Sequence, residues 1–192
     1  MPETLSQATI ETITRGLNGD PFSVLGPHKV THDGQPATAV RAFLPWAALV
    51  QVVTEDGTPY EMWRLHPDGF FEAVIPPDSP FNYVLRATNA SGNTVDLHDP
   101  YSFGPLLTDF DLHLIREGTH YRTYEKLGAH IREVGGVRGV HFAVWAPNAL
   151  RTSVIGNFNG WDARVQPNAL PPGAGRVGDI PAGDRRGRGV QV

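Results

Sequence analysis

A short loop late in the chain carries the side chains with the clearest binding chemistry. Its sequence is Gly156-Asn157-Phe158-Asn159-Gly160-Trp161-Asp162. Proteins bind sugars by placing an aromatic face against the apolar face of the sugar ring, while amide and carboxylate groups bond to the hydroxyls. Trp161 follows Asn157 and Asn159 in a glycine-flanked turn, where a ring can be exposed. These three residues are therefore our candidate carbohydrate-binding residues.

The same residues also have a purely structural interpretation. In it, Trp161 packs on the edge of a β-sandwich, and the two asparagines stabilise the turn through positive φ angles and side-chain hydrogen bonds. The sequence leaves both interpretations open. Trp145 alternates within an expected strand and is assigned to a core or an interface, whereas Trp46 and Trp63 fit either role.

No catalytic or metal-binding arrangement is apparent. Two clusters of Asp and His lack the spacing of a calcium loop or a zinc helix, namely Asp109, Asp111 and His113, and Asp96, His98 and Asp99. We assign Asp109 and Asp111 to a helix N-terminus and Asp99 to a turn. We find no Ser/His/Asp grouping, phosphate-binding glycine loop or His-Glu-x-x-His motif. The sequence therefore predicts no catalytic residue, no metal ligand and no cofactor.

Composition narrows the class of protein. The chain has 192 residues, 40% of them hydrophobic, which is ordinary for a globular protein with one or two cores. Its formal net charge of −4 provides no basic surface for nucleic acid, and it has no cysteine for disulfides or zinc thiolates. It has no signal-peptide pattern and no apolar run of about 18 residues. We expect a cytoplasmic protein without nucleic-acid or membrane partners.

The elements that position these residues belong to an internal repeat. Ile13, Gly16, Phe22, Leu25, Gly26, His28, Pro45, Ala47 and Val52 recur, at one constant offset, as Ile115, Gly118, Tyr124, Leu127, Gly128, His130, Pro147, Ala149 and Val154. A constant offset over some forty positions without a gap indicates a duplicated unit of domain size. The chain is therefore expected to contain two related domains.

In the first copy, a short helix is predicted to precede a set of strands. The helix covers residues 4–17, with capping-box spacing at Thr4 and Gln7 and an apolar face of Ile10, Ile13 and Leu17. Alternation of period two predicts strands at 40–44, 50–52, 71–75 and 83–87, separated by turns at Asp33-Gly34, Asp56-Gly57, Asp68-Gly69 and Ser91-Gly92. This pattern favours an all-β fold, an immunoglobulin-like β-sandwich, with a small barrel as the alternative.

The second copy begins in the same way. Residues 106–127 predict a helical segment capped by Thr108 and Asp111, with Leu112, Ile115 and Leu114 as its apolar face. Strands follow at 140–144 and 152–155, joined by a turn at Pro147-Asn148.

The pattern then stops, because residues 168–192 contain no aromatic side chain and are rich in Gly, Pro and Arg. We expect an incomplete second sandwich and a disordered tail. The tail is either a natural linker or out-of-frame translation, and the second reading is favoured because the alternation ends in mid-domain.

Several longer motifs together resemble one enzyme family. They are Asp20–His28, Asp99–Phe103, Tyr124–His130, Val137–Val140, Phe142–Ala149 and Gly156–Asp162. The combination, over about residues 15–165, resembles the N-terminal portion of bacterial 1,4-α-glucan (glycogen) branching enzymes, truncated or frameshifted after about residue 165.

The resemblance implies an N-terminal β-sandwich of branching-enzyme type at 1–105, the start of a family 48 carbohydrate-binding (glycogen-binding) module at 106–167, and an aberrant tail at 168–192. In related modules the Trp of the Phe-Asn-x-Trp motif stacks on sugar, which supports Trp161. The Lys and Trp that assist it there lie in later strands that have no match here.

The resemblance also sets the expected activity. The family's catalytic (β/α)₈ barrel, with its Asp nucleophile and Glu acid/base, matches no position of this sequence, so no catalytic residue is assigned. We expect a non-catalytic fragment that at most binds α-glucan, either glycogen or a linear α-1,4-glucan. The alternatives are a free-standing glycogen-binding or regulatory module, the N-terminal part of a debranching or trehalose-releasing relative, and a structural tandem that binds no sugar.

Overall fold

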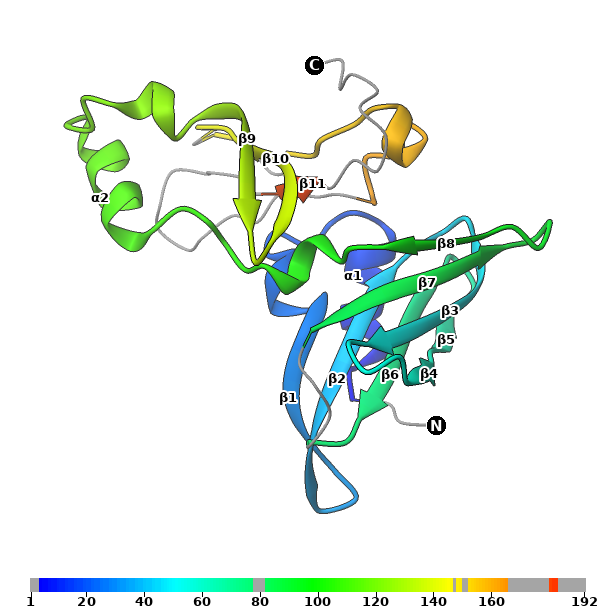
Figure 1. Cartoon of the computed structure of the whole chain (residues 1–192). Coiled ribbons are helices and arrows are strands. Elements are labelled where there is room, and N and C mark those ends of the chain that lie inside the picture. Colours follow the sequence, from blue (N-terminus) through cyan, green and yellow to red (C-terminus); the bar gives the residue numbers. More distant parts are fainter. Residues whose placement is uncertain (1–3, 78–81, 147, 150–151, 166–179, 183–192) are drawn as a thin grey trace. The chain divides into compact units, whose positions relative to one another are not determined.

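The computed structural model describes residues 4–77, 82–146, 148–149, 152–165 and 180–182 (Figure 1). The chain divides into unit 1, Met1–Arg15 with Val24–Ser102, and unit 2, Gly16–Ser23 with Phe103–Val192. Strands dominate the described residues, which contain two α-helices, so the predicted all-β class is confirmed. The boundaries near residues 105 and 167 stay predictions, and the predicted disordered tail lies outside the described residues except at 180–182. No helix in the described ranges is long and apolar enough to cross a membrane.

Unit 1 is a sandwich of two antiparallel sheets. Its described elements are α1 (Gln7–Thr14), β1 (Gly26–His32), β2 (Gln35–Phe43), β3 (Ala47–Thr54), β4 (Pro59–Glu61), β5 (Trp63–His66), β6 (Phe70–Ile75), β7 (Tyr83–Asn89), β8 (Thr94–Leu97) and the 3₁₀ turn η2 (Pro100–Ser102). One sheet has the strand order β1-β2-β6-β5 and the other β4-β3-β7-β8. The two sheets are separate, so this unit is the predicted sandwich and not the alternative barrel.

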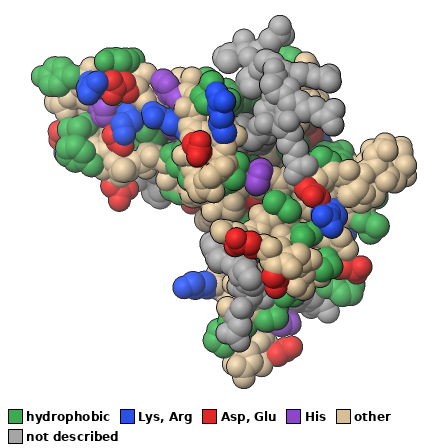
Figure 2. All heavy atoms as spheres, in the orientation of Figure 1, with side chains coloured by type: hydrophobic (Ala, Val, Ile, Leu, Met, Phe, Trp, Pro, Cys, Tyr) green, Lys and Arg blue, Asp and Glu red, His purple; other side chains and the backbone are tan. Residues whose placement is uncertain are grey.

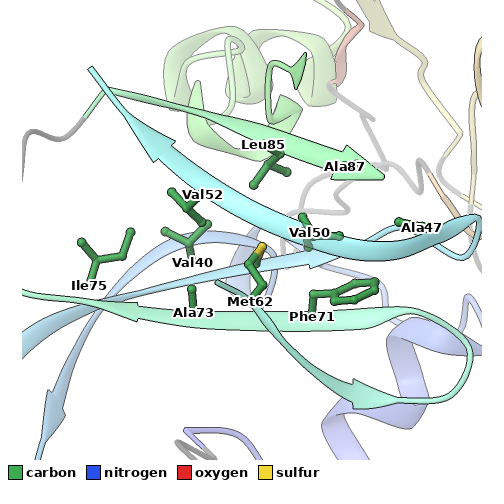
Figure 3. Close-up of a cluster of buried hydrophobic side chains, with 11 residues drawn as sticks. Val40, Ala47, Val50, Val52, Met62, Phe71, Ala73, Ile75, Leu85 and Ala87 are labelled. Atoms are coloured by element: carbon green, nitrogen blue, oxygen red, sulfur yellow. The ribbon is translucent and has the colours of Figure 1, made fainter. Parts of the chain in front are cut away.

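The core of unit 1 lies between the sheets (Figure 3). Alternate residues of β2 and β6 on one side, such as Val40 and Ala73, meet Val52 of β3 and Leu85 of β7 on the other. The buried positions follow the period-two pattern in the sequence, because successive side chains of a strand point to opposite faces. Met62, where the chain passes from β4 to β5 and so from one sheet to the other, is also part of this cluster.

The predicted turns of unit 1 are present, and Gly69 shows why one of them needs glycine. Gly34, Gly57, Gly69 and Gly92 all have positive φ angles. A β-carbon on Gly69 would lie 2.6 Å from the carbonyl oxygen of Leu44, so this turn has no room for a side chain. The turn therefore packs directly against the connection between the two sheets.

Helix α1 begins later and ends earlier than the sequence predicted. Its N-cap is Ser6, whose hydroxyl accepts a hydrogen bond from the Thr9 amide at 3.2 Å. Ile10 and Ile13 are fully buried as expected, but Leu17 is 67% exposed. The predicted Thr4–Gln7 cap and the Leu17 position are therefore wrong. Gly16 has a φ of 65°, which ends the helical path before Leu17.

Thr4 instead bonds to a buried ion pair on the outer face of the first sheet. Arg41 of β2 donates from Nε to Glu72 of β6 at 2.8 Å, and the two side chains are 4% and 0% exposed. The Thr4 hydroxyl donates to Glu72 and accepts from Arg41 Nη2. A buried charge needs such partners, so these contacts fix the segment before α1 on this face.

Unit 2 contains a shorter set of described elements. They are η1 (Pro21–Ser23), α2 (Asp109–Glu117), η3 (Thr123–Glu125), β9 (Gly128–Val134), β10 (Val137–Ala143), η4 (Asn157–Asn159) and β11 (Ile180–Ala182), and the strands form one sheet in the order β11-β10-β9. Thr108 and Asp111 form the predicted capping box of α2. Leu112, Leu107 and Ala143 form a small core with the partly buried Trp145, which confirms the core assignment of that tryptophan.

One predicted strand of unit 2 is wrong. Residues 152–155 form no regular strand, and β10 ends before Val144. Ser153 forms only an isolated β-bridge, and the carbonyl of the next residue, Val154, accepts a hydrogen bond from Asn159 Nδ2 at 2.8 Å, so the chain passes directly into the following loop. Pro147 of the predicted turn lies outside the described residues.

The sequence repeat is also a structural repeat. The offset that takes Gly26 to Gly128 carries η1 onto η3 and β1 onto β9 with identical bounds. It also carries the N-cap Ser6 onto the N-cap Thr108. His28 Nε2 bonds to the Leu25 carbonyl at 3.0 Å, and its counterpart His130 bonds to Leu127 at 2.9 Å. The duplication therefore preserves both helix starts and the turn that leads into each hairpin.

Candidate functional site

The backbone of the Gly156–Asp162 loop is closed by bonds to Gly156. The carbonyl of Gly156 accepts hydrogen bonds from the amides of Asn159 at 3.2 Å and Trp161 at 3.0 Å. Gly160 and Trp161 both have left-handed conformations, with φ angles of 64° and 62°. A left-handed tryptophan is uncommon, so the closed loop holds Trp161 in a conformation that an open chain would rarely adopt.

Asn159 supports the loop from inside. Its Oδ1 accepts a hydrogen bond from the Gly156 amide at 2.9 Å, and its Nδ2 donates to the Val154 carbonyl at 2.8 Å. Both ends of the carboxamide are thus bonded to backbone groups of the same loop. This geometry corresponds to the structural role that the sequence left open for the asparagines.

Trp161 and Asn157 form a side-chain pair. The indole Nε1 donates to Asn157 Oδ1 at 2.9 Å, and Trp161 remains 56% exposed. The polar atom of the indole is therefore satisfied within the loop, while more than half of the residue is open to solvent. An exposed aromatic face with a fixed edge can stack on the apolar face of a sugar ring.

The ring of Phe158 lies against Gly156. A β-carbon on Gly156 would lie 2.6 Å from Cε1 of the Phe158 ring, so the ring packs directly over the glycine backbone. The φ of Gly156 is 175°, which any residue can adopt, so a side chain at this position would need only the exposed Phe158 ring to move aside. Phe158 is itself exposed and adds a second aromatic side chain to the loop.

Asp162 and Arg164 form a bidentate ion pair directly after Trp161. Arg164 donates from Nη2 to Asp162 Oδ2 at 2.8 Å and from Nε to Oδ1 at 3.0 Å. The Arg164 side chain, followed by its backbone amide, holds the pKa of Asp162 below its usual value. Arg164 was not among the residues predicted from the sequence, although its Asp-x-Arg spacing was a signal. The pair stiffens the end of the loop.

The first Asp/His cluster of the sequence is not brought together. Asp111 instead accepts hydrogen bonds from Thr108, from His120 at 3.3 Å and from Lys126 at 3.1 Å. Burial would raise the pKa of Asp111, but hydrogen bonds from the Thr108 side chain, Lys126, the Thr108 amide and His120 outweigh it and lower the pKa to about 2. Asp111 therefore joins the start of α2 to the segment that leads into β9.

The second cluster is divided between two other contacts. Asp99 accepts a hydrogen bond from the Tyr83 hydroxyl at 2.6 Å and from the Tyr101 amide at 2.9 Å. Burial raises the pKa of Asp99 to about 6, although these hydrogen bonds act in the opposite direction. Asp96 pairs with Arg86 at 2.8 Å. Within the described ranges, no group of three or more His, Asp and Glu side chains is arranged to hold a metal ion.

Each unit also has other exposed aromatic side chains. Trp46 and Trp63 are exposed in unit 1, and Phe110, Tyr121 and Tyr124 are exposed in unit 2. Figure 2 shows hydrophobic side chains beside charged ones over the end of unit 2 that contains α2. Of the three exposed tryptophans in the described residues, only Trp161 has its indole N–H bonded to a side chain. Trp161 therefore differs from the other two tryptophans in the hydrogen bond that orients its ring, and not in how exposed it is.

Comparison with known proteins matches two segments of the chain to family models. Residues 6–101 match the model of the alpha-1,4-glucan branching enzyme GlgB N-terminal domain. Residues 126–169 match carbohydrate-binding module 48 (isoamylase N-terminal domain), and this segment includes the loop of Trp161. The motifs that suggested the resemblance in the sequence lie within or beside these two segments.

Individual relatives agree with the family models. The chain is 52% identical over 178 residues to the 1,4-alpha-glucan branching enzyme GlgB of Paramagnetospirillum magneticum, covering 91% of this chain and 23% of the relative. It is 47% identical over 163 residues to GlgB of Nostoc sp., covering 84% and 21%. For GlgB of Rhodopseudomonas palustris the identity is 51% over 156 residues, covering 81% and 21%. The chain thus spans less than a quarter of the length of these relatives, and it belongs to the alpha-1,4-glucan branching enzyme GlgB family, of which it is an N-terminal part.

Proposed function

We propose that this chain is the non-catalytic, α-glucan-binding part of a branching enzyme and that Trp161 is its principal glucan contact. The main support for this proposal is the exposed indole of Trp161. Its N–H donates a hydrogen bond to Asn157, and the loop lies in the segment that matches a carbohydrate-binding module. Transfer of α-1,4 chains to form α-1,6 branches is proposed for the whole protein. That reaction is assigned here from the names of the relatives.

The match of residues 6–101 supports a branching enzyme over the other relatives considered. It is specific to the N-terminal domain of branching enzymes, whereas a carbohydrate-binding module alone would also suit a debranching or trehalose-releasing enzyme or a free-standing module. Glycogen and linear α-1,4-glucans are accordingly the proposed ligands. A cytoplasmic location and the lack of nucleic-acid or membrane partners stay predictions.

Stacking on one ring supports weak binding. A binding free energy of about −4 kcal/mol corresponds to a dissociation constant on the order of 1 mM. Affinity electrophoresis suits this range, because the gel holds the polysaccharide at high concentration and reports weak binding as slower migration. We expect the full chain to migrate more slowly in a native gel that contains glycogen than in one without it.

The matched control for Trp161 lies in unit 1. Trp63 has the same side chain and nearly the same exposure, 54% against 56%, but its indole N–H has no bond like that to Asn157. Trp161→Ala should abolish the retardation by glycogen, while Trp63→Ala should leave it unchanged. Equal retardation of the two variants would refute the assignment to Trp161. A wild-type chain without any retardation would instead favour the scaffold that binds no sugar.

A further inference from the structure

Asn157 controls the direction of the indole plane. Trp161 is more than half exposed, so packing alone leaves its ring little constrained. The hydrogen bond from indole Nε1 to Asn157 Oδ1, at 2.9 Å, joins the edge of the ring to a residue of η4. η4 is in turn closed on Gly156 by backbone bonds. Asn157 therefore ties the ring to a rigid part of the loop.

The other end of the same carboxamide faces outward. Asn157 is exposed, and its Nδ2 has no hydrogen-bond partner among the described residues. Because Oδ1 and Nδ2 share one carbon, the two free N–H groups lie beside the edge of the indole. A glucose ring presents its apolar face to an aromatic ring and its equatorial hydroxyls around the rim. The Nδ2 group is thus placed to donate to a hydroxyl of a stacked glucose.

Asn159 has no such freedom. Its Oδ1 and Nδ2 are bonded to the Gly156 amide and the Val154 carbonyl. From this contrast we propose that Asn157 is a positioning residue for Trp161 and a hydrogen-bond donor to a glucose unit of an α-glucan, whereas Asn159 serves the loop alone. The inference rests on the proposed glucan binding and deepens it by giving the two asparagines different roles.

A double-mutant cycle between Asn157 and Trp161 tests the positioning role. Trp161→Phe keeps an aromatic face but removes the indole N–H, so Asn157 has no ring to hold. Affinity for maltoheptaose should fall about tenfold for Asn157→Ala in the Trp161 background, but only about threefold in the Phe background, where only the donor is lost. Equal losses in the two backgrounds would overturn the positioning role.

Asn157→Asp distinguishes the acceptor role of Oδ1 toward the indole from the donor role of Nδ2 toward the glucan. The carboxylate still accepts the indole N–H but cannot donate, so this variant should lose about threefold in affinity and keep the ring in place. Asn159→Ala is the control for a purely structural change, because it should shift the backbone amide signals of residues 154–160 as well. An Asn157→Asp variant that binds as tightly as wild type would overturn the donor role.

The indole resonance of Trp161 provides a readout that does not depend on binding. Trp161→Phe identifies that resonance in the ¹H–¹⁵N spectrum of the full chain. It should move toward the free-indole position in Asn157→Ala and stay near its wild-type position in Asn157→Asp. An unmoved resonance in Asn157→Ala would refute the positioning role. If Trp161→Ala abolishes binding but Asn157→Ala does not weaken it, only this inference fails; if wild type does not bind, the proposed function fails while the resonance still tests the positioning role.

Discussion

The turn at Asp56-Gly57 in unit 1 and the loop at Asn157–Trp161 in unit 2 stand at the same point of the repeat, but they differ in chemistry. The first is closed by small polar groups, with Gly57 N bonded to the Thr54 carbonyl at 2.8 Å and Thr58 N bonded to Asp56 Oδ1 at 3.1 Å. The second exposes Phe158 and Trp161. One frame thus carries two exposed aromatic side chains in one copy and an ordinary turn in the other, so the two copies differ most in this loop.

The two units also anchor their helical segments with different charges. Unit 1 buries Arg41 and Glu72 with Thr4 before α1. Ala143 stands at the repeat position of Arg41. Unit 2 instead holds the start of α2 through Asp111, which bonds to His120 and Lys126. The comparison teaches that, as far as the first hairpin of each copy, the duplication retained the path of the backbone and replaced the interactions that secure it.

The largest expected effect comes from breaking the ion pair of unit 1. Arg41→Ala leaves the buried carboxylate of Glu72 without its cation, which typically costs about 3–5 kcal/mol. Hydrogen exchange followed by mass spectrometry should therefore show loss of protection in β2 and β6 but not in β9 and β10. Lys126→Ala is the counterpart in unit 2 and should cost less, since Lys126 is partly exposed. Unchanged protection of unit 1 in Arg41→Ala would contradict this account.

The next effect compares one glycine position in both copies. Gly26 and Gly128 have φ angles of 85° and 106°, so alanine is strained at either site by about 1–3 kcal/mol. A β-carbon on Gly26 would also lie 2.8 Å from the Tyr101 carbonyl oxygen, whereas the nearest atom to one on Gly128 is His130 Nε2 at 3.7 Å. Gly26→Ala should thus lower the free energy of unfolding in urea more than Gly128→Ala does. A larger loss of unfolding free energy for Gly128→Ala would show that the close approach of Gly26 to Tyr101 does not add to the cost of a side chain.

The smallest effect concerns pH. Burial raises the pKa of Asp99 from 3.8 to about 6, so the folded state of unit 1 binds this proton more tightly than the unfolded state. Lowering the pH from 7 to 5 should therefore add about 1 kcal/mol to the free energy of unfolding of unit 1, and Asp99→Asn should remove that gain. The pKa of Asp111 is lowered to about 2, so its contribution to unit 2 is present above pH 4 and is lost only as the pH falls toward 2. Urea unfolding followed by segment-resolved hydrogen exchange at pH 7 and 5 checks the gain in unit 1, and stabilisation of unit 2 alone would contradict the assignment.

Local patterns in the sequence predicted much of this fold. The period-two pattern predicted strands within β2, β3, β6 and β7, and the Thr108–Asp111 capping box begins α2 as expected. Strand β1 was missed because Gly26–His32 is mostly polar and contains proline. The Asp33-Gly34 turn was its signal, since a hairpin turn needs a strand on both sides.

The hydrogen bonds of the candidate loop were harder to predict than the fold. The motif indicated Trp161, Asn157 and Asn159 together, but no sequence pattern separates an asparagine that holds an indole from one that holds the backbone. The roles of Asn157 and Asn159 depend on distances of 2.8–2.9 Å that only the folded loop defines. Thr4 illustrates the same limit, because its partners Arg41 and Glu72 are distant in sequence.

The most direct test follows both units at once in the full chain. Maltoheptaose is added to ¹⁵N-labelled protein, and the indole N–H signals of Trp46, Trp63 and Trp161 are assigned with Phe variants and followed during the titration. The account predicts a saturable shift of the Trp161 signal while those of Trp46 and Trp63 stay in place. Shifts confined to Trp46 or Trp63, or no shift at any tryptophan, would contradict it.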